Sequence, residues 1–403
     1  MEEAFILQIS LEIGLGGGSE CVAYELQRAW LAMGVDVRVL ASLATEPEPQ
    51  QGITYVAPWL TAGGMRARWR HMAALIAVPL FTLIATWRAY RSRGAKIILS
   101  HGDSLIGDVC VMHAVNRASL AEKRRAGYYG WLLNPSNLWV SWRDWWMLCG
   151  GRYRRIVAIS ERVRTQLKQY YNVPDDRIVT IPNGINLSRF DPKNVSSRTK
   201  VRLGFGVPED APLVLFVGSQ YQLKGLEFAI RGLAEMKTRA FLLVVGGDNP
   251  APFKRLAEQL GVSERVIFAG ARNDLPSIYP AADAFVLPTL YETFALVCLE
   301  AMASGLPVLA CPVGGVEDYL RDGENGFLIQ REPQDIAGKL DRLLNDPVLH
   351  QRLRNGGLAT AKNYAWEKIA KQYLSLFEEL LAERARNSRS PARFVLRDPR
   401  VPI

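Results

Sequence analysis

The sequence has 403 residues, of which 49% are apolar and 22% charged, a composition that suits packed globular domains and excludes a disordered or fibrous chain. This length favours two sizeable domains over one. The formal net charge is +9 and is unevenly placed, with surpluses of seven positive charges in residues 1–190 and five in residues 384–403, and a deficit of three between them.

The first half of the chain opens with the order strand, helix, strand. A strand-like run at 5–10 is followed by a helical pattern at 20–33 and a second strand-like run at 35–41. This βαβ order predicts a parallel sheet covered on both faces. More strand-like runs follow at 96–100, 155–159 and 178–181.

The second half repeats the pattern after a polar, loop-like stretch at 183–211, where we place the domain junction. Strands are predicted at 213–217, 240–245, 265–269, 284–287, 308–310 and 326–329, with helices at 226–236, 252–260, 275–281 and 295–304. We therefore predict an α/β protein with one Rossmann-like domain over 1–190, another over 191–365, a C-terminal helix over 366–383 and a basic flexible tail over 384–403.

Glycines follow the first predicted strand, in the run GLGGGSE at residues 14–20. Gly16, Gly17 and Gly18 would let backbone N–H groups approach an anion at the start of the following helix. The run is not the dinucleotide-binding fingerprint, because Ser19 stands where its last glycine would be. A tight turn without a ligand remains the alternative.

A second candidate site follows the first strand of the second domain, at Ser219 and Lys224. Ligands of open α/β sheets bind at the carboxyl ends of strands, where a lysine can reach a phosphate. A solvated surface lysine is the alternative.

The most specific pattern runs from Glu292 to Val308, with Glu300 within an apolar helical sequence. A carboxylate there is costly to bury unless it accepts hydrogen bonds, and vicinal sugar hydroxyls are suitable donors. The N–H groups of residues 293–295 would face a diphosphate at the helix N-terminus.

The segment from Glu292 to Val308 resembles the signature of retaining glycosyltransferases of family 4, which have the GT-B fold of two facing Rossmann-like domains. Other matching segments are the Gly-rich loop, residues 182–186 with Phe190, Lys224-Gly225, Gly314-Gly315 and residues 323–326. The run FVGSQYQLKG is most similar to the lipopolysaccharide-core α-glucosyltransferases of that family. The resemblance implies that the C-terminal helix crosses back to the first domain.

The resemblance also implies roles for individual residues. His113 would lie near the anomeric carbon, Lys224 would neutralise the diphosphate leaving group, and Glu292 would face the hydroxyls of the donor sugar. The other implied donor-binding residues are Gly16, Gly17, Gly18, Ser219, Arg272, Asn273, Thr293, Phe294, Ala295, Leu296 and Glu300. A lone histidine is more often structural, and this alternative stays open for His113.

The sequence departs from the family pattern at two positions. Ser219 replaces an arginine that many members carry as a second cation on the diphosphate, and Ala295 stands where glycine is commoner. No D-x-D triplet occurs in the sequence. Since lysine and helix dipole can replace a metal at the diphosphate, we expect neither metal nor other cofactor.

Basic residues and tryptophans gather in the first half. Residues 49–102 contain seven basic residues and no acidic one, and residues 117–155 contain eight basic residues and five tryptophans. This combination suits an anionic membrane interface. The residues predicted to face the membrane are Arg66, Arg68, Arg70, Trp142, Trp145 and Trp146. A buried helix with solvated basic ends is the alternative, and no nucleic-acid-binding motif accompanies the charge.

Features of location point to the cytoplasm. Five cysteines, an odd number without C-x-x-C spacing, predict neither a disulfide framework nor a zinc ribbon. We expect no signal peptide, and the longest apolar run, at 72–87, is shorter than the roughly 20 residues that span a bilayer.

The sequence therefore predicts a metal-independent retaining glycosyltransferase, cytoplasmic and peripheral on the inner face of the plasma membrane. Its donor would be a nucleotide-diphosphate sugar, with UDP favoured and GDP-mannose as the alternative, and its acceptor a glycan or a lipid-linked or lipopolysaccharide-type molecule. The rivals are a nucleotide-sugar epimerase of the same architecture and a non-enzymatic carbohydrate-binding role.

Overall fold

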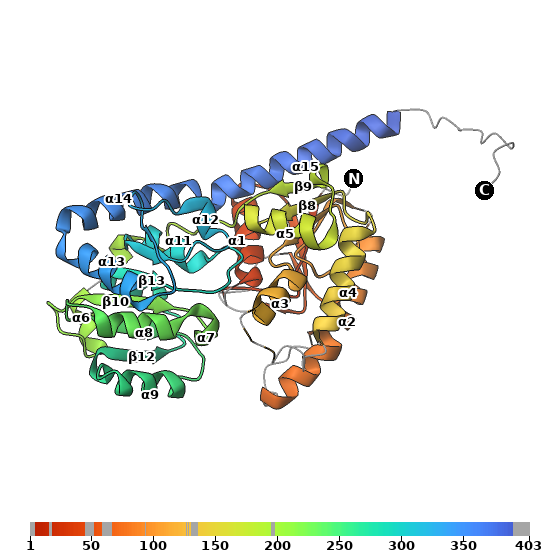
Figure 1. Cartoon of the computed structure of the whole chain (residues 1–403). Helices are drawn as coiled ribbons and strands as arrows, with labels where there is room; N and C mark the ends of the chain where they lie inside the picture. The colour runs from red at the N-terminus through yellow and green to blue at the C-terminus, as the bar shows by residue number, and fades with distance from the viewer. Residues whose placement is uncertain are drawn as a thin grey trace.

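The computed structural model describes residues 5–15, 18–44, 52–58, 67–92, 94–125, 127, 129, 136–194 and 198–389, with the side chains of 67–75 and 387–389 left out. Within this part of the chain, two parallel sheets are each covered by helices, and the two units lie side by side (Figure 1). The predicted α/β architecture with two doubly wound units is confirmed.

The first sheet has the strand order β5-β3-β1-β6-β7-β8-β9, with every pair parallel. Its strands are β1 Phe5–Ile9, β3 Val37–Ala41, β5 Ile53–Tyr55, β6 Ala95–Ser100, β7 Val109–Met112, β8 Arg155–Ala158 and β9 Ile178–Thr180. Its helices are α1 Ser19–Ala32, α2 Ala67–Arg91, α3 Asn116–Arg125, α4 Ser136–Cys149 and α5 Glu161–Tyr171. Strand β1 is buried along its whole length, as expected for a central strand of a parallel sheet.

The second sheet has the order β12-β11-β10-β13-β14-β15, again with parallel pairs. Its strands are β10 Leu213–Val217, β11 Phe241–Val245, β12 Val266–Gly270, β13 Ala284–Leu287, β14 Val308–Ala310 and β15 Phe327–Leu328. The helices around it are α6 Arg198–Gly204, α7 Tyr221–Lys224, α8 Leu226–Glu235, α9 Ala251–Gln259, α10 Leu275–Ile278, α11 Leu296–Ala303, α12 Val316–Tyr319, α13 Pro333–Asn345 and α14 Pro347–Asn363.

A separate short strand pair, which the sequence did not indicate, follows β1 and β3. Strands β2 (Glu12–Ile13) and β4 (Leu43–Ala44) pair in parallel. Because β2 follows β1 closely, Glu12 lies near the carboxyl end of β1, where it lines the same cavity as Ser19 and Glu20 of α1.

The chain passes between the two units at two adjacent places. The N–H of Ile185 donates to the carbonyl of Tyr364 at 2.7 Å, and Ile185 bridges to Ala365. Gly184 lies flat against the indole of Trp366, where an added Cβ would come within 2.5 Å of the ring. Only glycine therefore lets these two crossings pack together.

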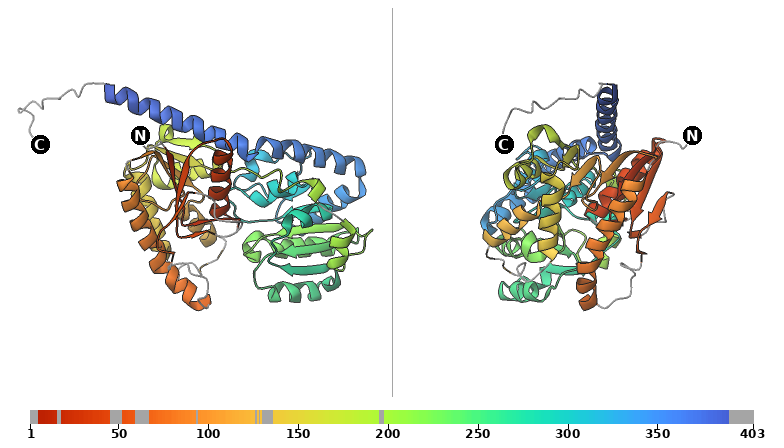
Figure 2. Two further views of the ribbon diagram at one scale, coloured as in Figure 1. Left: turned by 180° about the vertical axis from the view of Figure 1, so that it is seen from behind. Right: turned by 90° about the vertical axis from the view of Figure 1, so that its right-hand side faces the viewer.

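Helix α15 (Trp366–Arg389) begins at this crossing and runs along the first unit (Figures 1 and 2). On the first unit it packs against α1, where Trp30 donates from Nε1 to the carbonyl of Ala370 at 3.1 Å and contacts the rings of Tyr373 and Phe377. The helix is longer than predicted. It continues to Arg389, and Arg384, assigned by the sequence to a flexible tail, forms an ion pair with Asp108. Residues 390–403 lie outside the described part.

None of the described helices combines the length and the apolar character that a membrane crossing requires. Helix α2 has 25 residues but contains Pro79.

Candidate active site

A cavity of about 340 Å³ lies between the two units, and we call it the inter-domain cavity. From the second unit it is lined by residues after three neighbouring parallel strands: Gly218 and Ser219 after β10, Gly246 and Gly247 after β11, and Ala271, Arg272 and Asn273 after β12. From the first unit, Gly18, Cys21 and Glu25 of the α1 region face it. The cavity is thus at the carboxyl ends of the strands, where open α/β sheets bind ligands.

Glu300 contributes a buried carboxylate to this cavity from α11. The hydroxyl of Tyr279 donates to its Oε2 at 2.7 Å. Burial raises the pKa of Glu300, while the Tyr279 hydrogen bond and the charge of Arg189 lower it in part. An acidic group in such surroundings is stabilised by any further hydrogen-bond donor that a ligand brings.

Lys224 and Glu292 form an ion pair with each other, beside the inter-domain cavity rather than in its lining. The Glu292 side chain is 11% exposed. The lysine stem runs along the end of β10, since a Cβ at Gly218 would lie 3.3 Å from its Cγ. The ammonium group is therefore held near Gly218, which lines the cavity.

The loop from Thr293 to Ala295 is fixed by close packing. Ala295 has a φ of 59°, in the left-handed region, at the N-cap of α11. Glycine adopts this left-handed conformation with less steric strain than alanine, which is why glycine would be favoured at this position. Gly314 and Gly315 make room for the loop, because a Cβ on either would lie within 2.5 Å of Glu292 or Phe294.

The same loop contacts the first unit. The hydroxyl of Ser160, at the N-cap of α5, donates to the carbonyl of Thr293 at 2.9 Å. Phe294 is buried against Tyr319 and Tyr364. Neither Thr293, Phe294 nor Ala295 lines the inter-domain cavity, whereas the next residue, Leu296, does.

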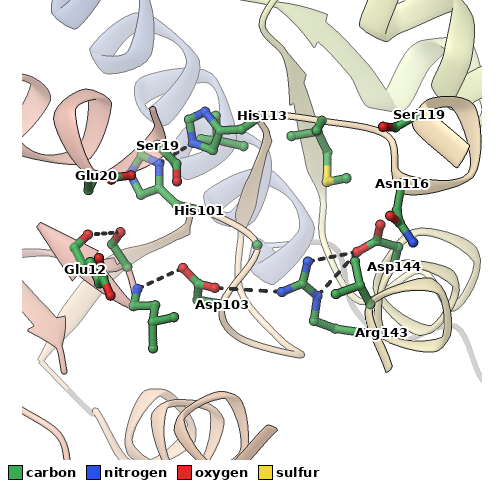
Figure 3. Close-up of a pocket in the computed structure, with 17 residues that line it drawn as sticks. Glu12, Ser19, Glu20, His101, Asp103, His113, Asn116, Ser119, Arg143 and Asp144 are labelled. Atoms are coloured by element: carbon green, nitrogen blue, oxygen red, sulfur yellow. Dashed lines mark hydrogen bonds and ion pairs between the residues drawn. The ribbon is translucent and has the colours of Figure 1, made fainter. Parts of the chain in front are cut away.

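A second cavity, of about 490 Å³, lies within the first unit, and we call it the His113 cavity (Figure 3). His113 follows β7 and stacks on His101, with a distance of 2.9 Å between His101 Nδ1 and His113 Nε2. Burial lowers the pKa of His113 to about 4 and that of His101 as well. Both imidazoles are therefore neutral at pH 7.

The predicted residues thus separate into groups. Gly18, Ser219, Arg272, Asn273, Leu296 and Glu300 line the inter-domain cavity. His113 lines the other cavity. Gly16, Gly17 and Arg66 lie outside the described residues, as do the side chains of Arg68 and Arg70.

The predicted tryptophans lie on α4, at the end of the first unit away from the second one (Figure 2). Trp142 and Trp145 are 43% and 47% exposed, and Trp146 is half-buried beneath the guanidinium of Arg152.

Several residues that line the two cavities or contact their lining were missed by sequence reasoning. Tyr279 reaches Glu300 across 21 positions of the chain, and Asn186 donates to Glu25 at 2.9 Å across 161. In the His113 cavity, Arg143 forms ion pairs with Asp103 and Asp144. Since each pair joins distant segments, no local pattern marks it. Among the described residues, no group of three or more His, Cys, Asp or Glu side chains is placed to hold a metal ion.

Two facing parallel α/β units with a cavity at the strand ends between them define the GT-B class. Residues 16–189 match the family described as Glycosyltransferase Family 4, and residues 197–359 match Glycosyl transferases group 1. The chain therefore has the GT-B fold, and each of its two units matches a family of glycosyltransferases.

Relatives and solved structures agree with this assignment. A D-inositol 3-phosphate glycosyltransferase from Acidothermus cellulolyticus is 36% identical over 252 residues, which cover 57% of this chain and 55% of the relative. The chain thus spans a little over half the length of the curated relatives it matches. WaaG, a glycosyltransferase involved in lipopolysaccharide biosynthesis, has the same fold at 21% identity (TM-score 0.74, covering 93% of this chain and 99% of that one). So does Anabaena HepE in complex with UDP-glucose, at 18% identity (TM-score 0.64, covering 94% and 100%).

Proposed function

We propose that the protein transfers a sugar from a nucleotide-diphosphate sugar to a glycan or a lipid-linked, lipopolysaccharide-type acceptor, with retention and without a metal ion. The carboxylate of Glu300, buried in the inter-domain cavity and hydrogen-bonded among the described side chains by Tyr279 alone, carries this proposal. Two adjacent ribose hydroxyls would supply the donors that this group lacks.

UDP is the favoured nucleotide, and GDP-mannose is the alternative donor. Structures of the same fold have been solved with UDP and with UDP-glucose, which supports the choice of UDP. Arg272 and Asn273, which follow β12 and line the cavity, would contact the base.

Lys224 would carry the leaving-group charge. Negative charge grows on the diphosphate as the glycosidic bond breaks, and a preorganised cation lowers the energy of that state. Glu292 orients the ammonium group in the ligand-free protein, and in the complex it would face the hydroxyls of the donor sugar. The N-terminus of α11, following Thr293 to Ala295, adds a partial positive charge.

His113 would lie near the anomeric carbon of the donor sugar, on the side from which the acceptor approaches. It lines the cavity of the first unit, which the first turn of α1 separates from the inter-domain cavity. Its imidazole is neutral and so offers a hydrogen bond without adding charge.

The proposal includes a location on the cytoplasmic face of a membrane, and the surface of α4 supports membrane contact. Leu138, Trp142 and Trp145 are exposed at a spacing of four and three residues, so they share one face of the helix. Helix α2 exposes Leu83, Trp87 and Tyr90 with the same spacing, and its last turn carries Arg88 and Arg91. Aromatic faces flanked by cations suit an anionic lipid surface.

The function is tested by ligand-induced stabilisation followed by a transfer assay. Nucleotide diphosphates and their sugar conjugates are compared by thermal shift, because a ligand of the folded state stabilises it by RT ln(1 + [L]/Kd). UDP and a UDP-sugar should raise the melting temperature with EDTA present. No shift with any nucleotide diphosphate would refute the proposal, and epimerisation of the donor without acceptor would identify the epimerase instead.

A further inference from the structure

The His113 cavity is the feature of the first unit that the donor does not account for. At about 490 Å³ its volume falls in the range of small-molecule sites. It adjoins the inter-domain cavity through the first turn of α1, because Ser19 and Glu20 line the former while Gly18 and Cys21 line the latter. A molecule held there would be next to the donor site.

The charged groups of this cavity are mostly acidic. The described lining residues include four carboxylates and one guanidinium, at Glu12, Glu20, Asp103, Asp144 and Arg143 (Figure 3). Glu12 lies on β2 and Glu20 in the first turn of α1, so two elements bring acidic groups to the same space.

The guanidinium is already engaged on two sides. Arg143 donates from Nη2 to Asp144 Oδ1 at 3.0 Å, and its Nη1 lies 3.8 Å from Asp103 Oδ1. Its side chain is only 14% exposed. Arg143 is therefore neutralised within the protein and offers little attraction to an incoming anion.

Glu12 and Glu20 have no cation within ion-pair distance among the described residues. Burial raises the pKa of Glu20, hydrogen bonds from its own N–H and from Ser19 lower it in part, and the nearby charges of Glu12 and Asp103 raise it further. Glu12, Glu20 and Asp103 line the same cavity, so their negative charges add up there. Such groups accept hydrogen bonds from hydroxyl or ammonium groups of a ligand and repel a phosphate.

The histidines add no positive charge to balance them. Gln8 donates from Nε2 both to the carbonyl of Ala23, at 3.0 Å, and to Nε2 of His101, at 2.9 Å. His101 then carries its proton on Nδ1 and donates to Nε2 of His113. This network assigns the proton of His113 to Nδ1, which has no hydrogen-bond partner among the described residues and can donate to a ligand.

From this arrangement we propose that the His113 cavity is the acceptor subsite and that it takes an uncharged or amine-bearing sugar in preference to a phosphorylated one. Carboxylates at Glu12 and Glu20 and the polar side chains of Asn116 and Ser119 supply hydrogen bonds to its hydroxyls. The inference rests on the proposed function. On this inference the acceptor preference of the chain differs from that of relatives whose name states a phosphorylated acceptor, D-inositol 3-phosphate.

The test compares three matched probes on the full chain saturated with UDP. Binding of glucose, glucosamine and glucose 6-phosphate, each at millimolar concentration, is measured by saturation-transfer difference NMR. Glucose and glucosamine should bind, and glucose 6-phosphate should bind at least about tenfold more weakly, because its charge meets unpaired carboxylates at short range.

A charge-reduced variant tests the stated cause. Glu12→Gln with Glu20→Gln removes the two unpaired carboxylates while keeping side-chain shape, and should abolish at least half of the preference against glucose 6-phosphate. Asp36→Asn is the matched control, because Asp36 is exposed and does not line the cavity. Unchanged melting of the variant in the absence of ligand shows that it is folded.

Each outcome decides one question. Equal or tighter binding of glucose 6-phosphate, no saturation transfer to any probe, or an unchanged preference in the double variant would overturn the acceptor assignment. Absence of UDP binding would overturn the proposed function, and it is read separately from the sugar signals.

Discussion

Replacing Glu300 by glutamine should weaken nucleotide binding while leaving the free protein at least as stable. The free carboxylate is buried and its pKa is raised, so its charged form is disfavoured by the fold at pH 7. Glutamine has nearly the same shape and can still accept the hydrogen bond that Tyr279 donates. It removes the buried charge, and we expect an equal or higher melting temperature without ligand.

The effect on UDP binding should have the opposite sign. If the ribose hydroxyls donate to Glu300, the variant loses hydrogen bonds to a charged group, each worth about 1.5 to 3 kcal/mol. Loss of one such bond corresponds to a dissociation constant about 10- to 150-fold higher. The free and UDP-bound proteins should therefore respond in opposite directions to one substitution.

Isothermal titration calorimetry with UDP, together with thermal melting of the free protein, measures both quantities. Glu264→Gln serves as control, because Glu264 is exposed and outside the inter-domain cavity. Unchanged UDP affinity in the Glu300 variant would refute the ribose role. Weaker binding accompanied by a lower melting temperature of the free protein would instead point to a general loss of structure.

Three further predictions concern the leaving group, the pH dependence and the surface. Lys224→Ala should lower kcat about 100-fold or more, because Lys224 is the preorganised cation that stabilises the leaving group. The control variant Lys237→Ala and added EDTA should leave kcat unchanged. Loss of activity in EDTA that magnesium restores would contradict this prediction. The pKa of His113 in the folded protein, about 4, lies below its value in the unfolded chain, so folding favours the neutral imidazole. The contribution of His113 to the free energy of unfolding is therefore full above about pH 6.5 and is lost as the pH falls toward 4. His113 should accordingly contribute about 2 kcal/mol to the loss of stability between pH 7.5 and 5 in urea unfolding, beside the contribution of His101, whose pKa is also lowered. His113→Asn should reduce the loss by about that amount, and an equal slope in both proteins would exclude this cause. Trp142→Ser with Trp145→Ser should reduce binding to anionic liposomes about tenfold in a sedimentation assay and make the remaining binding more sensitive to salt. The control Val348→Ser, at an exposed position of the second unit, should have neither effect. Equal binding by all variants would assign the tryptophans another role.

The sequence predicted the central strands well because a strand buried on both faces consists almost entirely of apolar residues. Leu213–Val217 is an uninterrupted apolar run, and it is a fully buried strand with parallel neighbours on both sides. The short pair β2 and β4 was missed, because two-residue strands carry no periodicity. The end of α15 was placed too early, because the ion pair of Arg384 with Asp108 joins residues 276 positions apart.

Individual residues of the site were found where a local pattern surrounds them. Glu300 stood out as a carboxylate in an apolar helical run, and it lines the inter-domain cavity. The pairing of Lys224 with Glu292 was not foreseen, because it depends on how β10 and the loop after β13 meet. The acidic lining of the His113 cavity could not be predicted from the sequence either, since its residues come from separate elements of the first unit.

Helix α15 has a consequence for how the protein is made. Trp30 emerges early from the ribosome, yet its hydrogen-bond partner, the carbonyl of Ala370, follows 340 residues later. Domains of a growing chain generally fold in the order of their synthesis. Here the first domain to be translated is the last to be completed, because its face at α1 stays uncovered until the second domain has been synthesised and α15 has left the exit tunnel.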